Sequence, residues 1–236
     1  MYYPNQTQSY KGIIVACTVI TLWFICIILL MNYNINFSSP WVYFLVLMQM
    51  HLYTGLFITA HDAMHGIVMP HHKKINFIIG QLCTLLYAVF PFKKLKTKHF
   101  EHHNFVHTKQ DPDYHHGNFF AWYISFIKQY ITWWQVVIMA IIFNILKIYI
   151  PQQNLILFWV LPSLLSTLQL FYFGTYLPHK GQHNNIYQST SQPKNHFIAF
   201  FTCYFFGYHY EHHHSPATPW WLLWKVKEQN VYTKSN

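Results

Sequence analysis

Ten of the eighteen histidines in this sequence fall into four windows of five residues. Two windows have the spacing His-x-x-His-His, at 99–103 and 209–213, and two have the spacing His-x-x-x-His, at 61–65 and 179–183. Positions i, i+3 and i+4 share one face of a helix, so each window can direct all of its imidazoles at one point. The ten residues are His61, His65, His99, His102, His103, His179, His183, His209, His212 and His213. We expect the rest of the chain to bring the four windows together.

Imidazoles in this number and spacing are typical of a metal centre. Ten nitrogen ligands exceed the four of a tetrahedral zinc site and fit two metal ions with about five ligands each. Imidazole binds iron, copper, nickel and zinc alike, so the ligands alone do not select the metal. None of the four cysteines forms a Cys-x-x-Cys pair, which argues against an iron–sulfur cluster or a zinc knuckle.

Five of the six acidic residues lie within or just beyond these windows. Metal-bound histidines usually donate their second ring N–H to a carboxylate or a carbonyl, so nearby acids are candidates for that support. The alternative is a solvated acid that balances neighbouring lysines, or, for the two acids after the second window, a turn. The candidates are Asp62, Glu101, Asp111, Asp113 and Glu211.

The composition predicts a membrane protein. The chain is 53% hydrophobic, 20% aromatic and only 9% charged, whereas soluble domains have about 25% charged residues. Its net charge of +9 comes from lysine alone, and the lysines lie beside apolar runs rather than along one amphipathic face. This distribution indicates a basic cytoplasmic surface beside a lipid bilayer and excludes a nucleic-acid partner.

The apolar runs predict an all-α integral membrane protein of a single domain, residues 1–236. Four spans are predicted, at 12–31, 41–59, 135–150 and 155–177. Pro162 should kink the last of these spans. The run 75–92 is long enough to cross, but a crossing would separate the first two windows, so we predict a re-entrant hairpin or an interfacial helix. The aromatic run 119–134 suits an in-plane interfacial helix.

This topology places 14 of the 15 lysines on one side, with Lys147 as the exception. By the positive-inside rule that side is the cytoplasm, and all four histidine windows lie there. His51 falls inside the second span. We interpret it as a packing residue rather than a metal ligand, although an ionisable group within a membrane favours function by default.

The windows and their flanks resemble the membrane fatty-acid desaturase and hydroxylase superfamily, and within it the bacterial carotenoid 4-ketolase branch. The matching stretches are FITAHDAMHG at 57–66, FGTYLPH at 173–179, YHYEHH at 208–213 and PWW at 219–221. The DPD turn at 111–113 is also similar to that family. The likeness runs from about residue 55 to residue 221.

The resemblance implies a non-haem di-iron centre that uses O2 as co-substrate. It implies iron binding by eight histidines, and His179 and His183 match an additional pair in the hydroxylase branch. The implied reaction oxidises C4 of a β-ionone ring twice, to a geminal diol that loses water to leave a ketone. A carotenoid would be the substrate, a ferredoxin-like protein the electron donor, and the bacterial inner membrane the location, with the active site facing the cytoplasm.

Aromatic side chains between the spans are candidates for a polyene tunnel, although for any one of them packing is the simpler role. These candidates are Tyr87, Phe90, Trp122, Trp159 and Tyr172.

Several alternatives share parts of this pattern. A carotenoid 3-hydroxylase or a lipid desaturase would have a similar metal site and differ only in the flanking motifs. A membrane metal transporter would place histidines near the bilayer midplane, whereas these windows lie at span ends or beyond. A structural membrane protein would bind no metal at all.

Overall fold

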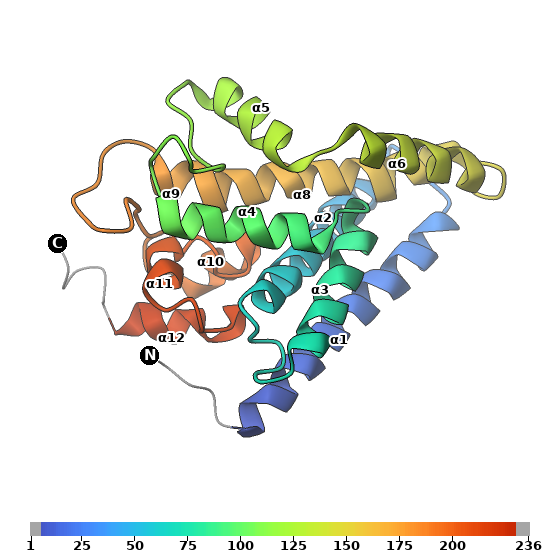
Figure 1. Cartoon of the computed structure of the whole chain (residues 1–236). Coiled ribbons are helices and arrows are strands. Elements are labelled where there is room, and N and C mark those ends of the chain that lie inside the picture. Colours follow the sequence, from blue (N-terminus) through green and yellow to red (C-terminus); the bar gives the residue numbers. More distant parts are fainter. Residues whose placement is uncertain (1–5, 230–236) are drawn as a thin grey trace.

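The computed structural model describes residues 6–229, and within that range every regular element is helical. Figure 1 shows the arrangement of these helices. The elements are α1 (Gln6–Met31), α2 (Pro40–Met64), α3 (Lys73–Ala88), α4 (Phe92–Phe105), α5 (Phe119–Tyr130), α6 (Trp133–Leu146), α7 (Gln152–Leu155), η1 (Ile156–Val160), α8 (Leu161–Phe171), η2 (Tyr172–Tyr176), α9 (Leu177–His179), α10 (His196–Cys203), α11 (His209–His214), η3 (Trp220–Leu222) and α12 (Leu223–Glu228).

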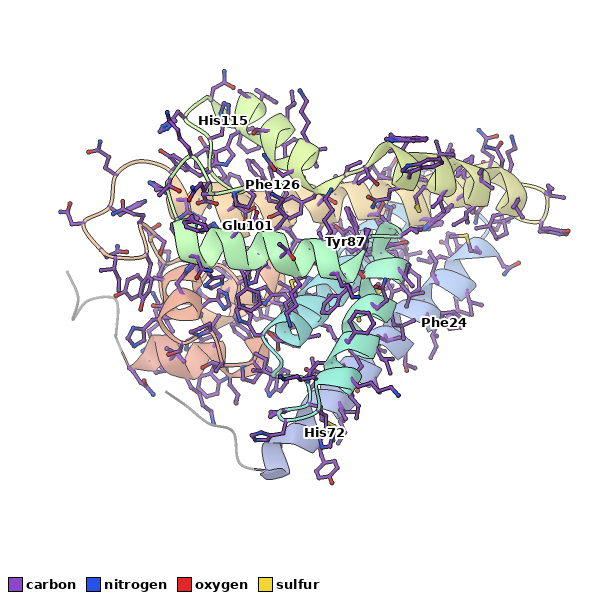
Figure 2. The ribbon with its side chains drawn as sticks, in the orientation of Figure 1. Phe24, His72, Tyr87, Glu101, His115 and Phe126 are labelled. Atoms are coloured by element: carbon purple, nitrogen blue, oxygen red, sulfur yellow. The ribbon has the colours of Figure 1, made fainter. Side chains whose placement is uncertain are left out.

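Three helical segments are long and apolar enough to cross a membrane: Tyr10–Met31, Pro40–Met64 and Gln152–His179. Each exceeds the roughly 20 residues that a bilayer core requires. The middle one, α2, packs against both α1 and α8 and is the centre of the bundle. Phe24 on α1 points away from the bundle and is 52% exposed, as expected of a side chain that faces lipid (Figure 2). These segments confirm the first, second and fourth predicted spans.

The predicted third span, 135–150, is shorter than expected. Its helix, α6, has 14 residues and is therefore about 21 Å long, less than the roughly 30 Å of a hydrocarbon core. It meets α5 at an angle of 83°. The break lies at Thr132, which is the N-cap of α6. Thr132 and Gln135 form a capping box, in which each side chain accepts a hydrogen bond from the backbone N–H of the other. By length and composition the described chain has three spanning helices, or up to five if each bent pair crosses.

The run 75–92 does not separate the first two windows. Helix α3 ends at Val89, whose left-handed backbone (φ 56°) caps the helix, and α4 leaves at an angle of 100°. Gly80 permits this corner, because a Cβ there would lie 2.2 Å from the Phe92 ring. The chain leaves α2 just after His65 and returns with His99 in direct contact with it, as predicted for a re-entrant segment.

Two π-helical turns interrupt the last span, at Ile156–Val160 and Tyr172–Tyr176. A proline follows each turn by two residues, at Pro162 and at Pro178. Proline lacks the N–H that a regular helix needs, and a π turn accommodates that loss. The irregularity predicted at Pro162 is therefore a π turn just before it, and a second one precedes the third histidine window.

Candidate metal centre

The structure gathers nine of the ten window histidines into two neighbouring groups, within each of which the potential ligand nitrogens lie within 4.8 Å of one another. The outer group consists of His61, His65, His99, His103 and His212. The inner group consists of His102, His179, His209 and His213. The two groups touch, because the rings of His103 and His213 stack with their centroids 4.2 Å apart.

The two His-x-x-His-His windows do not each converge on one point, contrary to the prediction. In the window on α4, His99 and His103 join the outer group and His102 joins the inner group. In the window on α11 the division is reversed, because His212 alone joins the outer group. Residues i and i+4 point in nearly the same direction, while residue i+3 points about 100° away from i+4. Each of the two His-x-x-His-His windows therefore contributes to both groups.

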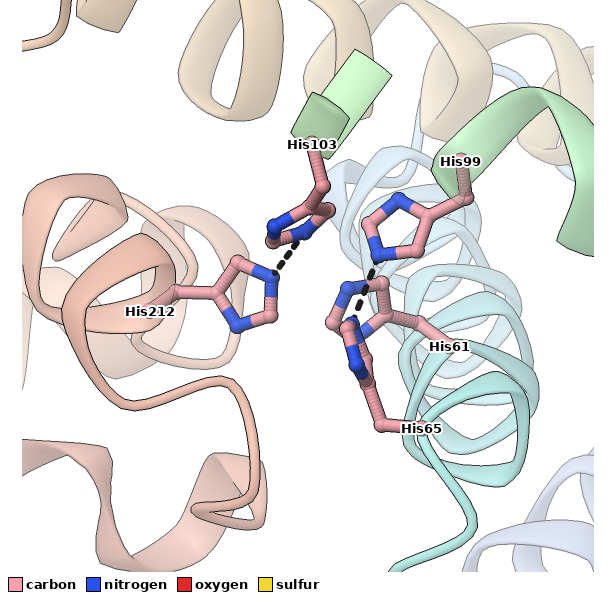
Figure 3. A group of neighbouring side chains, drawn as sticks. All are labelled: His61, His65, His99, His103 and His212. Atoms are coloured by element: carbon pink, nitrogen blue, oxygen red, sulfur yellow. Dashed lines mark hydrogen bonds between the residues drawn. The ribbon is translucent and has the colours of Figure 1, made fainter. Parts of the chain in front are cut away.

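The spacing of the facing nitrogens fits bound metal ions. In the outer group the Nε2 atoms of His65 and His99 lie 2.7 Å apart. A dashed line joins these two rings in Figure 3. In the inner group Nε2 of His209 lies 2.8 Å from that of His179 and 2.9 Å from that of His213. Two nitrogens that bind one ion at about 2.0–2.1 Å lie about 2.9 Å apart when the angle between them is near 90°.

Two ring nitrogens strengthen this fit. Nε2 of His61 is buried and has no hydrogen-bond partner among the described residues, although the His61 ring packs against those of His65, His99 and His212 (Figure 3). A buried polar atom without a partner is costly, and a metal ion would relieve that cost. Burial, together with the neighbouring imidazoles, also holds the pKa of His212 and of His213 well below the usual range. Both rings are therefore neutral, the form that binds metal.

Two of the four rings of the inner group, those of His102 and His179, are held by hydrogen bonds from their outward-facing nitrogens, whereas Nδ1 of His209 has no described partner. Nδ1 of His102 donates to Oδ1 of Asp111 at 2.9 Å, and Nδ1 of His179 donates to the Gln188 carbonyl at 2.8 Å. In a neutral ring this leaves the lone pair on Nε2, which faces the other members of the group. His107 adds a further tether, because its Nε2 donates to the His179 carbonyl at 2.7 Å. This arrangement is typical of ligands that outer contacts orient.

Among the predicted supporting acids, Asp111 has the expected contact and Asp113 lies close by. Oδ2 of Asp113 is 4.0 Å from Nδ1 of His102, and Oδ1 accepts a short hydrogen bond from the Tyr130 hydroxyl. Burial raises the pKa of Asp113 to about 6.

The other three acids do not hydrogen-bond to a window histidine. Asp62 lies 3.7 Å from Nδ1 of His61, too far for a hydrogen bond, and accepts one from the Trp220 backbone at 3.1 Å. Glu101 pairs with Lys98 at 2.8 Å on the surface of α4. Glu211 is buried and pairs with Lys227 at 3.1 Å. Asp62 and Glu211 anchor the C-terminal segment, which carries the last window.

His183 lies outside both groups. Its Nε2 is buried without a described partner, and its ring centroid is 6.1 Å from that of His107. The chain leaves its helix at Lys180, whose backbone is extended, so the i+4 relation to His179 no longer applies. The ring of His51 stacks on that of Tyr204, with their centroids 4.2 Å apart. His51 belongs to neither group, which agrees with the packing role predicted for it.

Sequence reasoning missed His107, Tyr130 and the Gln188 carbonyl. His107 lies four residues beyond the second window, which is a readable signal. Tyr130 carries no comparable signal, since its contact with Asp113 bridges 17 positions and depends on how α5 packs. The carbonyl of Gln188 could not be found by residue type, because every residue has one.

A largely apolar cavity opens beside both groups. His61 and His99 of the outer group, and His102 and His209 of the inner group, form part of its wall. Two of the predicted tunnel residues, Tyr87 and Phe90, line it, and Tyr87 lies near the corner between α3 and α4 (Figure 2). The remaining lining residues are Phe57, Met64, Leu95, Asp113, Phe126, Ile127, Tyr130, Ile131, Thr167, Leu170, Gly174, Thr175 and Phe206. Trp122, Trp159 and Tyr172 are not among them.

The second π turn shapes this wall. Gly174 and Thr175 both lie in that turn and both line the cavity. A Cβ at Gly174 would lie 2.7 Å from the Phe206 ring, so the glycine permits that ring to pack closely. Apart from the histidines, the polar side chains of the wall are few, and Tyr130 with Asp113 forms one polar corner next to His102.

Comparison with known proteins places this geometry in a family. The sequence model of the fatty acid desaturase family matches residues 38–130 and 118–234. A β-carotene ketolase of Haematococcus lacustris is 40% identical over 188 residues, which cover 73% of this chain and 58% of that protein. A β-carotene 4-ketolase of Protosiphon botryoides is 37% identical over 254 residues, covering 94% of this chain and 64% of the relative. No solved structure matches the chain.

A shorter bacterial relative matches more evenly. A β-carotene ketolase of a Paracoccus species is 40% identical over 181 residues, which cover 73% of each chain. The chain thus spans about 58–64% of the length of the first two relatives and about three quarters of the bacterial one. On the family match and on relatives of this identity and coverage, the chain belongs to the fatty acid desaturase family, and within it to the group of the β-carotene ketolases.

Proposed function

We propose that this chain is a membrane-bound, O2-dependent oxygenase that introduces a keto group at C4 of the β-ionone rings of carotenoids. Its substrate would be β-carotene, converted to echinenone and then canthaxanthin. The observation that carries this proposal is the junction of two histidine groups with one apolar cavity. The names of the relatives, which include a zeaxanthin 4-ketolase of Chlamydomonas reinhardtii, direct the choice of substrate and carbon.

The residues that would hold two irons are the nine histidines of the outer and inner groups. Five nitrogens in one group and four in the other leave room for an exchangeable ligand at an octahedral ion, whereas structural zinc takes four protein ligands in a closed site. His183 is not among the proposed ligands, because it lies outside both groups. When bound, the two irons would supply the activation of O2 and the abstraction of an allylic hydrogen.

The protein itself would hold the substrate ring beside the metal site and exclude water from it. The cavity wall is mostly aliphatic and aromatic, so it would bind an apolar ring and exclude water from the reacting carbon. His61 and His209 lie on that wall, so a ring in the cavity would lie beside both groups. Such positioning makes the reaction between the bound ring and the metal site effectively unimolecular. The first hydroxylation makes the ring more polar, and the corner of Tyr130 and Asp113 gives that hydroxyl a partner within the cavity.

We further propose that the protein resides in a bacterial inner membrane with the histidine groups on the cytoplasmic side. The segments 32–39 and 147–151 lie at the end of the bundle away from the last histidine window (Figure 1). Of the 15 lysines, only Lys147 falls within these two segments. Reporter fusions after Lys74 and Lys98 should both report cytoplasm, and a fusion after Asn34 should report the outside. Opposite results for Lys74 and Lys98 would contradict this orientation.

Product analysis tests the reaction. Expression in a bacterium that makes β-carotene should turn the cells from yellow-orange toward red, because a ketone at C4 extends the conjugated polyene. Chromatography should show echinenone followed by canthaxanthin. Accumulation of zeaxanthin would identify a 3-hydroxylase instead, and unchanged carotenoids with altered lipid unsaturation would identify a desaturase.

Elemental analysis tests the metal. Protein purified anaerobically with iron should contain close to two irons per chain. One iron, or stoichiometric zinc in active protein, would contradict the di-iron proposal. A transporter would instead move metal across sealed vesicles and form no oxidised carotenoid.

A further inference from the structure

The outer group lies at the surface of the protein, beside an exposed aromatic ring. Phe100 on α4 is 36% exposed, and its ring centroid lies 5.4 Å from that of His65 and 5.9 Å from that of His99. His65, His99 and His103 are themselves only half-buried. The four histidines of the inner group are all buried. The outer group therefore lies nearer to an external electron donor than the inner group does, and Phe100 is an exposed aromatic ring in contact with it.

The surface around Phe100 is positively charged. Lys93, Lys96 and Phe100 follow one another at helical spacing on the exposed side of α4 and line one shallow groove with Thr97, Glu101 and Asn104. Nζ of Lys96 lies 5.8 Å from the centroid of the Phe100 ring. Neither Lys93 nor Lys96 forms an ion pair with a described residue, whereas the charge of Glu101 is balanced by Lys98. The groove thus carries an excess of positive charge.

We propose that this groove is the docking surface for an acidic one-electron carrier protein, and that electrons enter the metal centre at the outer group through Phe100. This inference rests on the proposed oxygenase function. Each hydroxylation replaces one C–H bond by C–OH and consumes one O2, two electrons and two protons, while the second oxygen atom leaves as water. The carrier would deliver the two electrons one at a time, and solvent would supply the protons.

Anionic lipid headgroups are the other class of partner that two lysines attract. An aromatic ring beside lysines also suits a bilayer interface, but lipid binding does not account for the contact of this ring with three histidines of the metal site. The combination of charge with a ring that leads inward fits a redox protein, since electrostatic complementarity steers such partners and orients them.

Two variants separate docking from electron transfer. The full-length, iron-loaded protein in lipid nanodiscs is mixed anaerobically with a reduced, acidic plant-type [2Fe–2S] ferredoxin. Reduction of the irons is followed by absorbance, and ferredoxin binding is measured separately. K96E should weaken binding about tenfold at low salt and reduce the salt dependence of the association rate. F100L keeps an apolar side chain in the groove and is compared at saturating ferredoxin, where affinity does not limit the rate. Its reduction should be about tenfold slower, with iron content unaltered.

K225E is the matched control, because Lys225 on α12 is also exposed and also lies over an aromatic ring, 5.5 Å from that of Trp224. It should change neither measurement. Dithionite reduction of each variant supplies the rate that does not depend on docking. If K96E and K225E behave alike, or if K96E weakens only the association with anionic nanodiscs, the inference is wrong. Because the assay needs no carotenoid, a failure of the proposed ketolation would leave its result interpretable.

Discussion

The outer and inner histidine groups are built from the same residue type, and the same two windows contribute to both, but their surroundings differ. The inner group is fully buried, and two of its four rings are fixed through Nδ1 by Asp111 and the Gln188 carbonyl. In the outer group three of five rings are half-buried, and Asp62, the acid beside His61, lies 3.7 Å from its Nδ1, too far for a hydrogen bond. The inner group is therefore the more buried and the better supported, whereas the outer group is the more accessible.

This difference teaches that ligand identity and ligand support are separate properties. Supporting hydrogen bonds orient a ring and fix its tautomer, so they make a site selective and slow to lose its metal. A site with fewer such bonds and more exposure exchanges ligands and electrons more readily. We therefore expect the two metals to differ in lability and in redox behaviour, although histidine provides the ligands of both.

The strongest test removes one ligand from each group. His212→Ala removes an outer ligand and His213→Ala an inner one, from adjacent positions of the same short helix. Each should lower ketolation by more than about a hundredfold, beyond the loss typical of a supporting residue. Iron content, measured with membrane insertion as the control, should fall toward one per chain in both variants. Full activity in either variant would exclude that histidine as an essential ligand.

The next test acts on the support of the inner group alone. Asp111→Asn should lower activity or iron affinity by about 10–100-fold, because His102 loses its charged acceptor. Glu101→Gln is the matched control. Glu101 lies within the window 99–103 but contacts Lys98 rather than a histidine. It should stay within about twofold of the wild type. Equal losses in the two variants would show that Asp111 has no special role.

Metal removal sharpens the comparison further. A water-soluble chelator should release iron in two phases, with the outer iron leaving several-fold faster than the inner iron. The physical reason is access, because the outer ligands His65, His99 and His103 are only half-buried. Asp111→Asn should accelerate the slow phase and leave the fast one unchanged. A single phase in the wild type would mean that the two groups hold metal equally.

The smallest expected effect concerns the third window. His183→Ala should change activity and iron content by less than about twofold, because His183 belongs to neither group. His179→Ala, four positions away, should behave like the other ligand variants. Iron analysis of the two proteins decides the point, and loss of one iron on mutation of His183 would show that the ring moves inward when metal binds.

The sequence by itself determined the helical membrane class, the two long spans predicted at 12–31 and 41–59, and nine of the histidines that come together. Apolar runs of bilayer length can bury their backbone polar groups only as helices, so length and composition suffice for that part. The spacing of the windows identified the histidines but led to the wrong expectation that each window converges on one point. Residue i+3 points about 100° away from i+4, and the packing of the helices places these two directions in different groups.

Only the tertiary structure decided which histidines meet across helices. The pairing of His103 with His212, and of His179 with His209, depends on how α4, α9 and α11 pack, and those elements lie far apart in the chain. The same holds for the excluded His183 and for the surface position of Glu101, both of which carry the right residue type in the right window. Spacing reports the geometry within one helix, whereas metal coordination requires nitrogens from several helices, and packing alone places those.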